Sequence, residues 1–148
     1  MEMIYIQKCT DSTQIETIEK QIDLRLNIKW LELQDYRVFC RHLKLCGQKP
    51  MLKRNWKKII KNGTMYCGVF IENKMVSRAA VEKYSPQAWE VADVRTANEY
   101  RNNGYAQKVC LFVLKYILEN NKNATIRTED DNYKMKQIID KLGFVPID

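Results

Sequence analysis

The stretch Arg101-Asn102-Asn103-Gly104-Tyr105-Ala106 lies between two regular patterns of apolar residues, and the rest of the chain can be interpreted outward from it. Before it, residues 88–96 alternate from Trp89 onward, which predicts a half-buried strand. After it, apolar residues recur at helical spacing as far as about Asn120, which predicts a helix. The stretch is therefore the loop of a predicted strand-loop-helix unit.

The residues of this loop suit an anionic ligand. Gly104 can adopt positive φ or let a ligand approach the backbone closely, and the small Ala106 leaves room beside it. The first turn of the following helix has unpaired N–H groups and the positive end of the helix dipole, and Arg101 adds charge. Together these features predict a pyrophosphate site. An ordinary glycine-containing loop before a helix would show the same pattern, so the context has to decide.

Apolar spacing predicts the other elements and a single domain over residues 1–148. Predicted strands cover about 3–8, 64–71, 75–83, 88–96, 124–128 and 144–147. Predicted helices begin near 11–13 and cover about 31–45, 49–61, 104–120 and 132–142. The turn at 72–74 predicts a hairpin. Because helices stand at separate places around one group of strands, the predicted class is α+β, with a mixed, mostly antiparallel central sheet.

Composition excludes several classes of protein. No apolar run approaches the roughly 20 residues that a membrane-spanning helix needs. The N-terminus has neither a basic region nor a cleavage site, so we expect no signal peptide and a cytoplasmic location. Five cysteines without a C-x-x-C pair indicate buried reduced thiols, and we expect no metal site. The single histidine, His42, excludes His-rich sites, and we expect it on a solvated helix face beside Arg41 and Lys44.

The charge of the chain points to an anionic partner without choosing one. The formal net charge is +7, which would suit nucleic acid, a membrane surface or a phosphorylated small molecule. Residues 49–61 contain six lysines or arginines around Trp56. Two interpretations remain open for this segment: an amphipathic helix with a solvated basic face, or a patch that binds an anionic ligand.

From Trp89 to Phe144 the sequence resembles the Gcn5-related N-acetyltransferases. The signature of that family is Gln/Arg-x-x-Gly-x-Gly/Ala after the fourth strand, and here it is Arg101-Asn102-Asn103-Gly104-Tyr105-Ala106. The family often ends its fourth helix with Asn, a few helical residues and Leu-Gly-Phe, which correspond here to Asn132 and 142–144. The order of the earlier elements also fits.

The resemblance implies transfer of an acyl group, usually acetyl from acetyl-CoA, to a primary amine by direct attack in a ternary complex. The backbone of Val94, Arg95 and Thr96 would pair with the pantetheine arm, and an amide near Val94 would stabilise the oxyanion. Asn132 would lie near the coenzyme, cap the last helix, or do both. The pyrophosphate would be held, beside Arg101, by the amides of Asn102, Asn103, Gly104, Tyr105 and Ala106.

The sequence departs from the family pattern in two places. Many members carry, on the last helix, a tyrosine that protonates the departing thiolate, and here that position is Ile139. Tyr133 lies about a turn and a half earlier in the helix and cannot replace it. The general acid is therefore not identified, and water can serve. The usual closing hairpin is cut short near Pro146, which cannot donate a ladder bond. We expect this edge to be completed by another chain, for instance in a homodimer, or to stay open.

A general base is assigned to Glu90. A carboxylate in apolar surroundings can accept a proton near neutral pH, and Glu90 lies between Trp89 and Val91, 11 residues before Arg101. The histone-acetylating members of the family place their catalytic glutamate at this separation. Strand alternation predicts that Glu90 shares a face with Ala92 and Val94.

Two other carboxylates, Glu82 and Asp93, are rivals for this role. The same alternation predicts that Asp93 points to the face opposite Glu90. The simpler alternative for Glu90 is a surface carboxylate paired with a lysine on a neighbouring strand.

Two other functions remain as alternatives. One is a basic nucleic-acid-binding module, although no helix-turn-helix, zinc-finger or RNP signature occurs. The other is a catalytically inactive protein of the same fold that binds coenzyme A. The sequence does not identify the acceptor amine.

Overall fold

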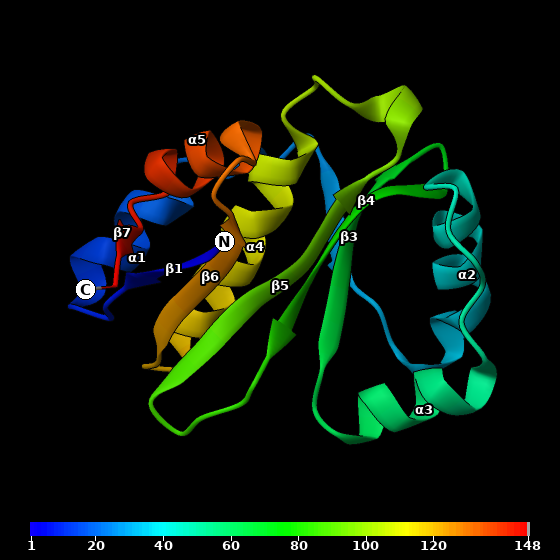
Figure 1. The fold of residues 1–148 in the computed structure, drawn as a ribbon, viewed down its shortest axis with the longest axis horizontal. Helices are drawn as coiled ribbons and strands as arrows, with labels where there is room; N and C mark the ends of the chain where they lie inside the picture. Colours follow the sequence, from blue (N-terminus) through cyan, green and yellow to red (C-terminus); the bar gives the residue numbers. More distant parts are fainter. Residues whose placement is uncertain (148) are drawn as a thin grey trace.

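The protein is built around one twisted sheet, which a computed structural model describes over residues 1–147 (Figure 1). The strands are β1 (Glu2–Gln7), β2 (Asn27–Trp30), β3 (Met65–Ile71), β4 (Lys74–Glu82), β5 (Ala88–Thr96), β6 (Asn123–Glu129) and β7 (Val145–Pro146). Their order in the sheet is β2-β3-β4-β5-β6-β1-β7. Within the described residues β5 and β6 form a parallel pair and the other pairs are antiparallel. The predicted α+β class with a mixed, mostly antiparallel sheet is confirmed.

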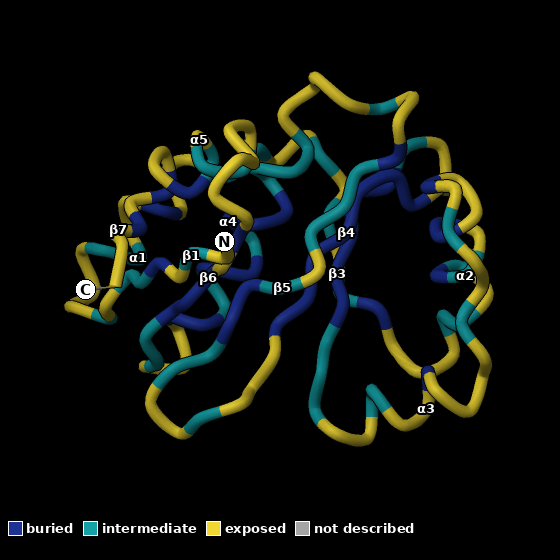
Figure 2. Tube along the Cα trace, viewed as in Figure 1, coloured by how far each residue is buried: buried dark blue, intermediate teal, exposed yellow. Residues whose placement is uncertain are grey.

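Helices cover both faces of the sheet. They are α1 (Ser12–Glu19), α2 (Tyr36–Leu45), α3 (Lys53–Lys61), α4 (Tyr105–Glu119) and α5 (Tyr133–Lys141), with short 3-10 turns η1 (Leu33–Asp35) and η2 (Asn98–Tyr100). The larger core cluster packs α4 and α1 against one face, and a smaller cluster packs α2 and α3 against the other. The central strands and α4 are accordingly buried, whereas the outer sides of α2 and α3 are exposed (Figure 2). None of the helices in residues 1–147 is long and apolar enough to cross a membrane.

The elements after residue 52 match the sequence prediction closely. β3 and β4 are joined at Glu72 and Asn73, which both have positive φ, 50° and 66°, as a two-residue hairpin turn of the primed type requires. In α3, Trp56 is fully buried and the lysines are exposed. The segment is therefore an amphipathic helix whose basic face is solvated, as one of the two interpretations predicted.

The prediction for residues 27–45 was partly wrong. The sequence pattern placed a helix over 31–45, but Asn27–Trp30 form strand β2 and α2 begins only at Tyr36. The burial of β2 alternates residue by residue, as expected for an edge strand with one face on the core. Within α2 the buried side chains are Phe39, His42 and Leu43, whereas Leu33 is half exposed.

His42 corrects a second expectation. Its side chain is fully buried instead of solvated, and its Nδ1 lies 3.0 Å from the carbonyl oxygen of Met75. Because a carbonyl can only accept, Nδ1 carries the hydrogen and donates it. Burial is the main reason that the pKa of His42 falls to about 4, so the ring is neutral at pH 7.

The sheet edge beyond β6 is completed by the chain itself. β1 pairs along its whole length with β6, from Glu2 opposite Glu129 to Gln7 opposite Ala124. The short β7 then pairs with the other side of β1, with Pro146 opposite Tyr5. The expectation from the sequence was that another chain would cover this edge or that it would stay open. Instead the N-terminal strand fills the position between β6 and β7.

Candidate active site

The loop between β5 and α4 has the open backbone that the sequence predicted. Gly104 is the N-cap of α4 and has φ +78°, and Asn102 also has positive φ. A Cβ atom built at Gly104 would meet no other atom within 4 Å. The space above this glycine is therefore open for an approaching ligand, and what makes glycine suitable here is its backbone conformation.

Unpaired amides surround this glycine. The first amide of the helix with an acceptor in the chain is that of Lys108, which donates to the carbonyl of Gly104. The backbone amides of Tyr105, Ala106 and Gln107 come before the first i to i−4 hydrogen bond of the helix. They donate to no atom of the described chain. Arg101 is exposed, and its Nε donates to the Thr96 carbonyl at 3.2 Å, which ties the loop to the end of β5. The arrangement is able to hold a pyrophosphate.

The two parallel strands separate next to this loop. The pairing of β5 with β6 runs from Ala88 opposite Asn123 to Val91 opposite Ile126 and stops there. A cavity of about 310 Å³ lies at this separation, hereafter the strand-split cavity. It is lined by Glu82, Glu90, Val91, Ala92, Asp93, Val94, Ile126, Arg127, Thr128, Asn132 and Met135. Of the predicted site residues, it brings together Glu90, Val94 and Asn132.

A bulge in β5 changes which side chains face this cavity. The register with β4 shifts between Arg78 and Ala80, so that two residues of β5 oppose one of β4. At the bulge Asp93 has φ +48°, a left-handed conformation that is uncommon for residues with a side chain. Val91 and Val94 consequently both pack with the α4-side core, although they are three residues apart.

The bulge overturns the predicted faces of Glu90 and its neighbours. Asp93 bonds to Tyr66, which belongs to the α2-side core together with Ala80, and Glu90 lies opposite Glu82 on that same side. Asp93 and Glu90 therefore share a face, and Val94 points to the other one. The prediction from strict alternation failed because the extra residue reverses the alternation beyond it.

Glu90 is buried and held by partners on β6. Its carboxylate receives hydrogen bonds from Arg127, with Nε 3.0 Å from both oxygens and Nη2 2.9 Å from Oε1. The hydroxyl of Thr125 donates to Oε1 at 3.2 Å. Arg127 also contacts Glu2 of β1 at 3.5 Å. The simpler sequence alternative, a surface carboxylate paired with a lysine on a neighbouring strand, is correct in one respect, because Glu90 is paired with a cation on β6. It is wrong in the other two, because the cation is an arginine and Glu90 is only 6% exposed.

A second carboxylate is fixed from the α2 side. Arg78 is buried, and its two terminal nitrogens donate to Asp93 Oδ1 at 3.0 Å and to Gln48 Oε1 at 2.9 Å. The phenol of Tyr66 donates to Asp93 Oδ2 at 2.6 Å. Burial and the Asp93 carboxylate raise the pKa of Tyr66, so it remains a donor. Asp93 is nevertheless exposed on its cavity side, with 43% of its side chain accessible.

The last helix contributes two further observations. Asn132 is the N-cap of α5, and its side-chain oxygen accepts from the Met135 amide at 3.1 Å. Its capping role is confirmed, and its place in the cavity lining is compatible with a role toward a ligand. Ile139 is 1% exposed and belongs to the core, while Tyr133 is exposed at the start of α5. No group of three or more potential metal ligands occurs in residues 1–147.

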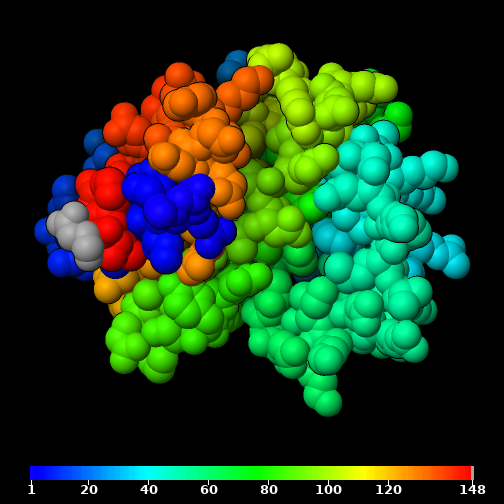
Figure 3. Space-filling view, viewed as in Figure 1, coloured from blue at the N-terminus to red at the C-terminus, as the bar shows by residue number. Residues whose placement is uncertain are grey.

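Sequence reasoning missed the arginines that hold these carboxylates. Arg78 was the available signal, because a charged residue inside the apolar run 75–81 must find a partner if it is buried. Thr125 and Arg127 alternate with apolar residues along β6, but their link to Glu90 depends on the parallel register, which the sequence does not reveal. Figure 3 shows the face in question, with β5 between the N-terminal residues on one side and α2 and α3 on the other.

Comparisons with known proteins agree with this fold. A family model described as the acetyltransferase (GNAT) family matches residues 27–144. The match begins at β2, so the strand β1 that completes the sheet lies outside it. No match is found among curated protein sequences.

Solved structures share the fold at low sequence identity. A GNAT-family protein from Novosphingobium aromaticivorans DSM 12444 is 18% identical with a TM-score of 0.70, over 99% of this chain and 59% of that one. A GCN5-related N-acetyltransferase-like protein from Streptococcus suis 89/1591 is 15% identical with a TM-score of 0.68, over 100% and 58%. An aminoglycoside acetyltransferase from an uncultured soil metagenomic sample is 14% identical with a TM-score of 0.67, over 80% and 87%. The chain thus spans less than two thirds of the first two of these proteins.

Proposed function

The chain belongs to the acetyltransferase (GNAT) family, and from this premise we propose that it transfers the acetyl group of acetyl-CoA to a primary amine by direct attack in a ternary complex. The observation that carries the proposal is the separation of β5 from β6 beside a loop with open amides, in a chain of this family. The two features lie at the two ends of the same short backbone segment, 91–105. A long, kinked donor with a pyrophosphate and a thioester arm fits such a site.

On the donor side, the backbone does the binding. The amides after Gly104 would hold the pyrophosphate, with Arg101 and the residues from Asn102 to Ala106 around it. Beyond Val91 the β6-facing edge of β5 is unpaired, so Val94, Arg95 and Thr96 could pair with the pantetheine arm as an added strand. The amide near Val94 would then donate to the thioester oxygen as that oxygen gains negative charge.

On the acceptor side, carboxylates favour an amine. Glu82, Glu90 and Asp93 line the strand-split cavity together with Arg127, and the excess of negative charge attracts an alkylammonium ion. The ammonium must lose a proton before its nitrogen attacks the carbonyl carbon; we assign that proton to Glu90, directly or through water. When the carbon–sulfur bond breaks, the thiolate takes a proton from solvent, because Ile139 has none to give.

A donor-binding experiment tests the proposal. Acetyl-CoA at about 100 times its Kd should stabilise the native state by about 2.7 kcal/mol and raise the Tm by several degrees. Gly104→Val should abolish this shift, because valine resists positive φ and would fill the open space above the loop. Release of free thiol in the presence of a panel of primary amines would then report turnover.

Gly63→Val is the matched control for this experiment. Gly63 also has positive φ, 93°, and open space around it, but it follows α3. Gly63→Val should lower the Tm of the free protein about as much as Gly104→Val does, while the Tm should still rise with acetyl-CoA. An unchanged Tm of the wild type in millimolar acetyl-CoA would refute the proposal. Binding without thiol release on the amine panel would instead support the inactive, coenzyme-binding alternative.

A further inference from the structure

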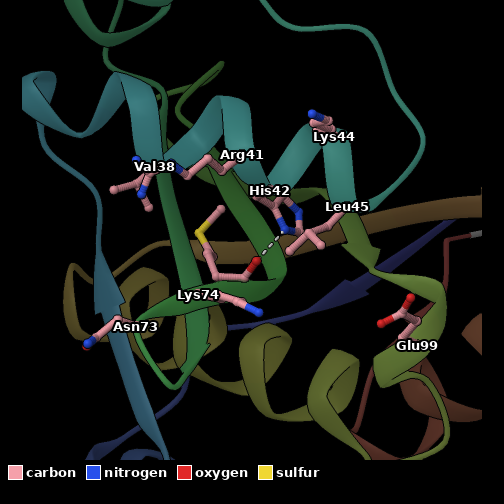
Figure 4. Close-up of a pocket in the computed structure, with 9 residues that line it drawn as sticks. Val38, Arg41, His42, Lys44, Leu45, Asn73, Lys74 and Glu99 are labelled. Atoms are coloured by element: carbon pink, nitrogen blue, oxygen red, sulfur yellow. Dashed lines mark hydrogen bonds between the residues drawn. The ribbon is translucent and has the colours of Figure 1, made fainter.

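A second cavity, of about 480 Å³, lies away from the strand split (Figure 4). It is enclosed by α2, by the turn between β3 and β4, and by η2. Its lining consists of Val38, Arg41, His42, Lys44, Leu45, Asn73, Lys74, Met75 and Glu99. It shares no lining residue with the strand-split cavity, and we call it the α2 cavity. Its volume is within the range of sites that bind small organic molecules.

The floor of the α2 cavity is apolar and uncharged. Val38 of α2 packs against the core cluster that contains Met75 of β4, which is 2% exposed, and Leu45 lines the same cavity. His42 lies between them, with its Nδ1 hydrogen bond directed to the Met75 carbonyl (Figure 4). Because burial keeps this ring neutral at pH 7, His42 lies beneath the floor without adding charge to it. The floor therefore favours an apolar body.

The rim of the α2 cavity carries unpaired positive charge. Arg41, Lys44 and Lys74 are exposed, and none of them makes a side-chain hydrogen bond or ion pair within residues 1–147. The one acidic residue in the lining, Glu99, is likewise without a salt bridge in this part of the chain. Three cations against one carboxylate leave an excess of two positive charges around an apolar floor.

We propose that the α2 cavity binds a small amphipathic anion, specifically an aliphatic monocarboxylate. The aliphatic body would lie on Val38 and Leu45, above the nearly buried Met75, and the carboxylate would bind at the rim of Arg41, Lys44 and Lys74. Charge-assisted hydrogen bonds from these side chains are stronger than neutral ones, and the apolar surface on one side of them excludes water. This inference does not depend on acyl transfer, since the two cavities have no residue in common.

The probes for this site are octanoate and 1-octanol, which have the same number of carbons and differ in charge. Octanoate should produce saturable amide chemical-shift changes along α2 and at Lys74 and Met75 in a titration followed by NMR. Because hydrogen bonds to a charged group contribute about 1.5 to 3 kcal/mol, 1-octanol should bind at least about tenfold more weakly.

Two matched pairs of variants locate the site. Arg41→Gln, Lys44→Gln and Lys74→Gln together should weaken octanoate at least tenfold, by the same reasoning. The triple variant Lys53→Gln, Lys57→Gln and Lys58→Gln on α3 loses the same charge and should change the affinity less than about twofold, since these exposed side chains do not line the cavity and exposed charges that make no contact are screened. Leu45→Trp should fill the cavity and abolish binding, whereas Leu52→Trp, at another exposed leucine, should not.

Several results would overturn the proposal. They are equal affinity for octanoate and 1-octanol, an equal loss in the two charge variants, or shifts that do not saturate in a wild type that remains folded. Sedimentation is measured at the same concentrations. A dimer that Leu45→Trp dissociates would show that a second copy of the chain covers the apolar floor, and this too would exclude the small anion.

Discussion

The strand-split cavity and the α2 cavity have opposite chemistry within one basic chain. The first is lined by three carboxylates and one arginine, and the second by three cations and one carboxylate around an apolar floor. In the first, Glu90 and Asp93 are each held by an arginine at about 3 Å, whereas in the second the cations have no partner in the described residues. The formal net charge of +7 therefore predicts neither site. Local placement of charge, set by the sheet and the helices, determines what each cavity can bind.

The difference also concerns rigidity. The charged side chains of the strand-split cavity arise from strands, and hydrogen bonds from arginines fix Glu90 and Asp93 before any ligand arrives, which is the arrangement that catalysis by positioning requires. The side chains at the rim of the α2 cavity are long and free to rotate, so a ligand there must order them at an entropic cost. We therefore expect the strand-split cavity to be selective in geometry and the α2 cavity to be selective mainly in charge.

The largest expected effect concerns Glu90. If Glu90 accepts the proton of the amine, Glu90→Gln should lower kcat/KM at pH 7 by about 10²-fold or more, with partial recovery at high pH as the free amine becomes abundant. Glutamine keeps an oxygen that can accept from Arg127, so the fold should survive. The measurement is the pH profile of kcat/KM with any amine that gives turnover.

The control for this experiment is Glu82→Gln. Glu82 is the cross-strand neighbour of Glu90 and lines the same cavity, but it has no arginine partner within residues 1–147. It should cost much less than Glu90→Gln. A Glu90→Gln enzyme with near-wild-type kcat/KM at pH 7 would remove Glu90 from the mechanism, and Asp93→Asn would then be the next variant to measure.

A smaller effect, a loss of stability at low pH, is expected from His42 beneath the floor of the α2 cavity. The pKa of His42 is lowered to about 4 by burial, while the unfolded chain has the ordinary value of 6.5. Between these values the unfolded chain binds a proton that the native state does not, so stability is lost as pH falls through this window. From pH 7 to pH 5 the free energy of unfolding should decrease by about 2 kcal/mol through this residue alone.

His42→Gln isolates that contribution. The other charged groups that act on the ring, Arg78, Asp93 and Arg95, and the adjacent Cys46 thiol are present in both proteins. The difference in unfolding free energy between wild type and variant, measured by urea denaturation at pH 7 and pH 5, should therefore shrink by this amount. A difference that is independent of pH would mean that the His42 ring titrates alike in the native and the unfolded state.

The sequence predicted the part of the fold that local patterns control. The strand-loop-helix unit around Gly104, the 72–74 hairpin and α3 all follow from spacing and turn residues within short windows. The sequence prediction failed where a distant segment sets the position of a strand, or where one extra residue sets the direction of its side chains. The position of β1 between β6 and β7 requires pairing across more than 100 residues, and the bulge at Asp93 reverses strand alternation without a glycine or proline to announce it.

The candidate sites divide in the same way. The open backbone of the loop 101–106 was predictable because it depends on consecutive residues. The partners of Glu90 and Asp93 were not, because Arg127 and Arg78 reach them across neighbouring strands. No sequence pattern predicted the α2 cavity, because its lining comes from a helix, a turn and a loop. The sequence pattern also predicted that His42 is solvated.

The smallest effect is expected from the most basic segment of the chain. Substitution of Lys53, Lys57 and Lys58 by Gln should change acetyl-CoA affinity less than about twofold, because these side chains are exposed on α3 and charges beyond roughly 8 Å are screened at physiological ionic strength. The same variant removes three of the charges that a nucleic-acid site would use. With fewer phosphates neutralised, duplex binding would become weaker and less dependent on salt. Calorimetry with acetyl-CoA and fluorescence anisotropy with a labelled duplex measure the two affinities on one preparation. Sub-micromolar duplex binding at physiological salt in the wild type, abolished in the variant, would show that the exposed face of α3 is a binding surface, and that charge in this protein does not act only within its two cavities.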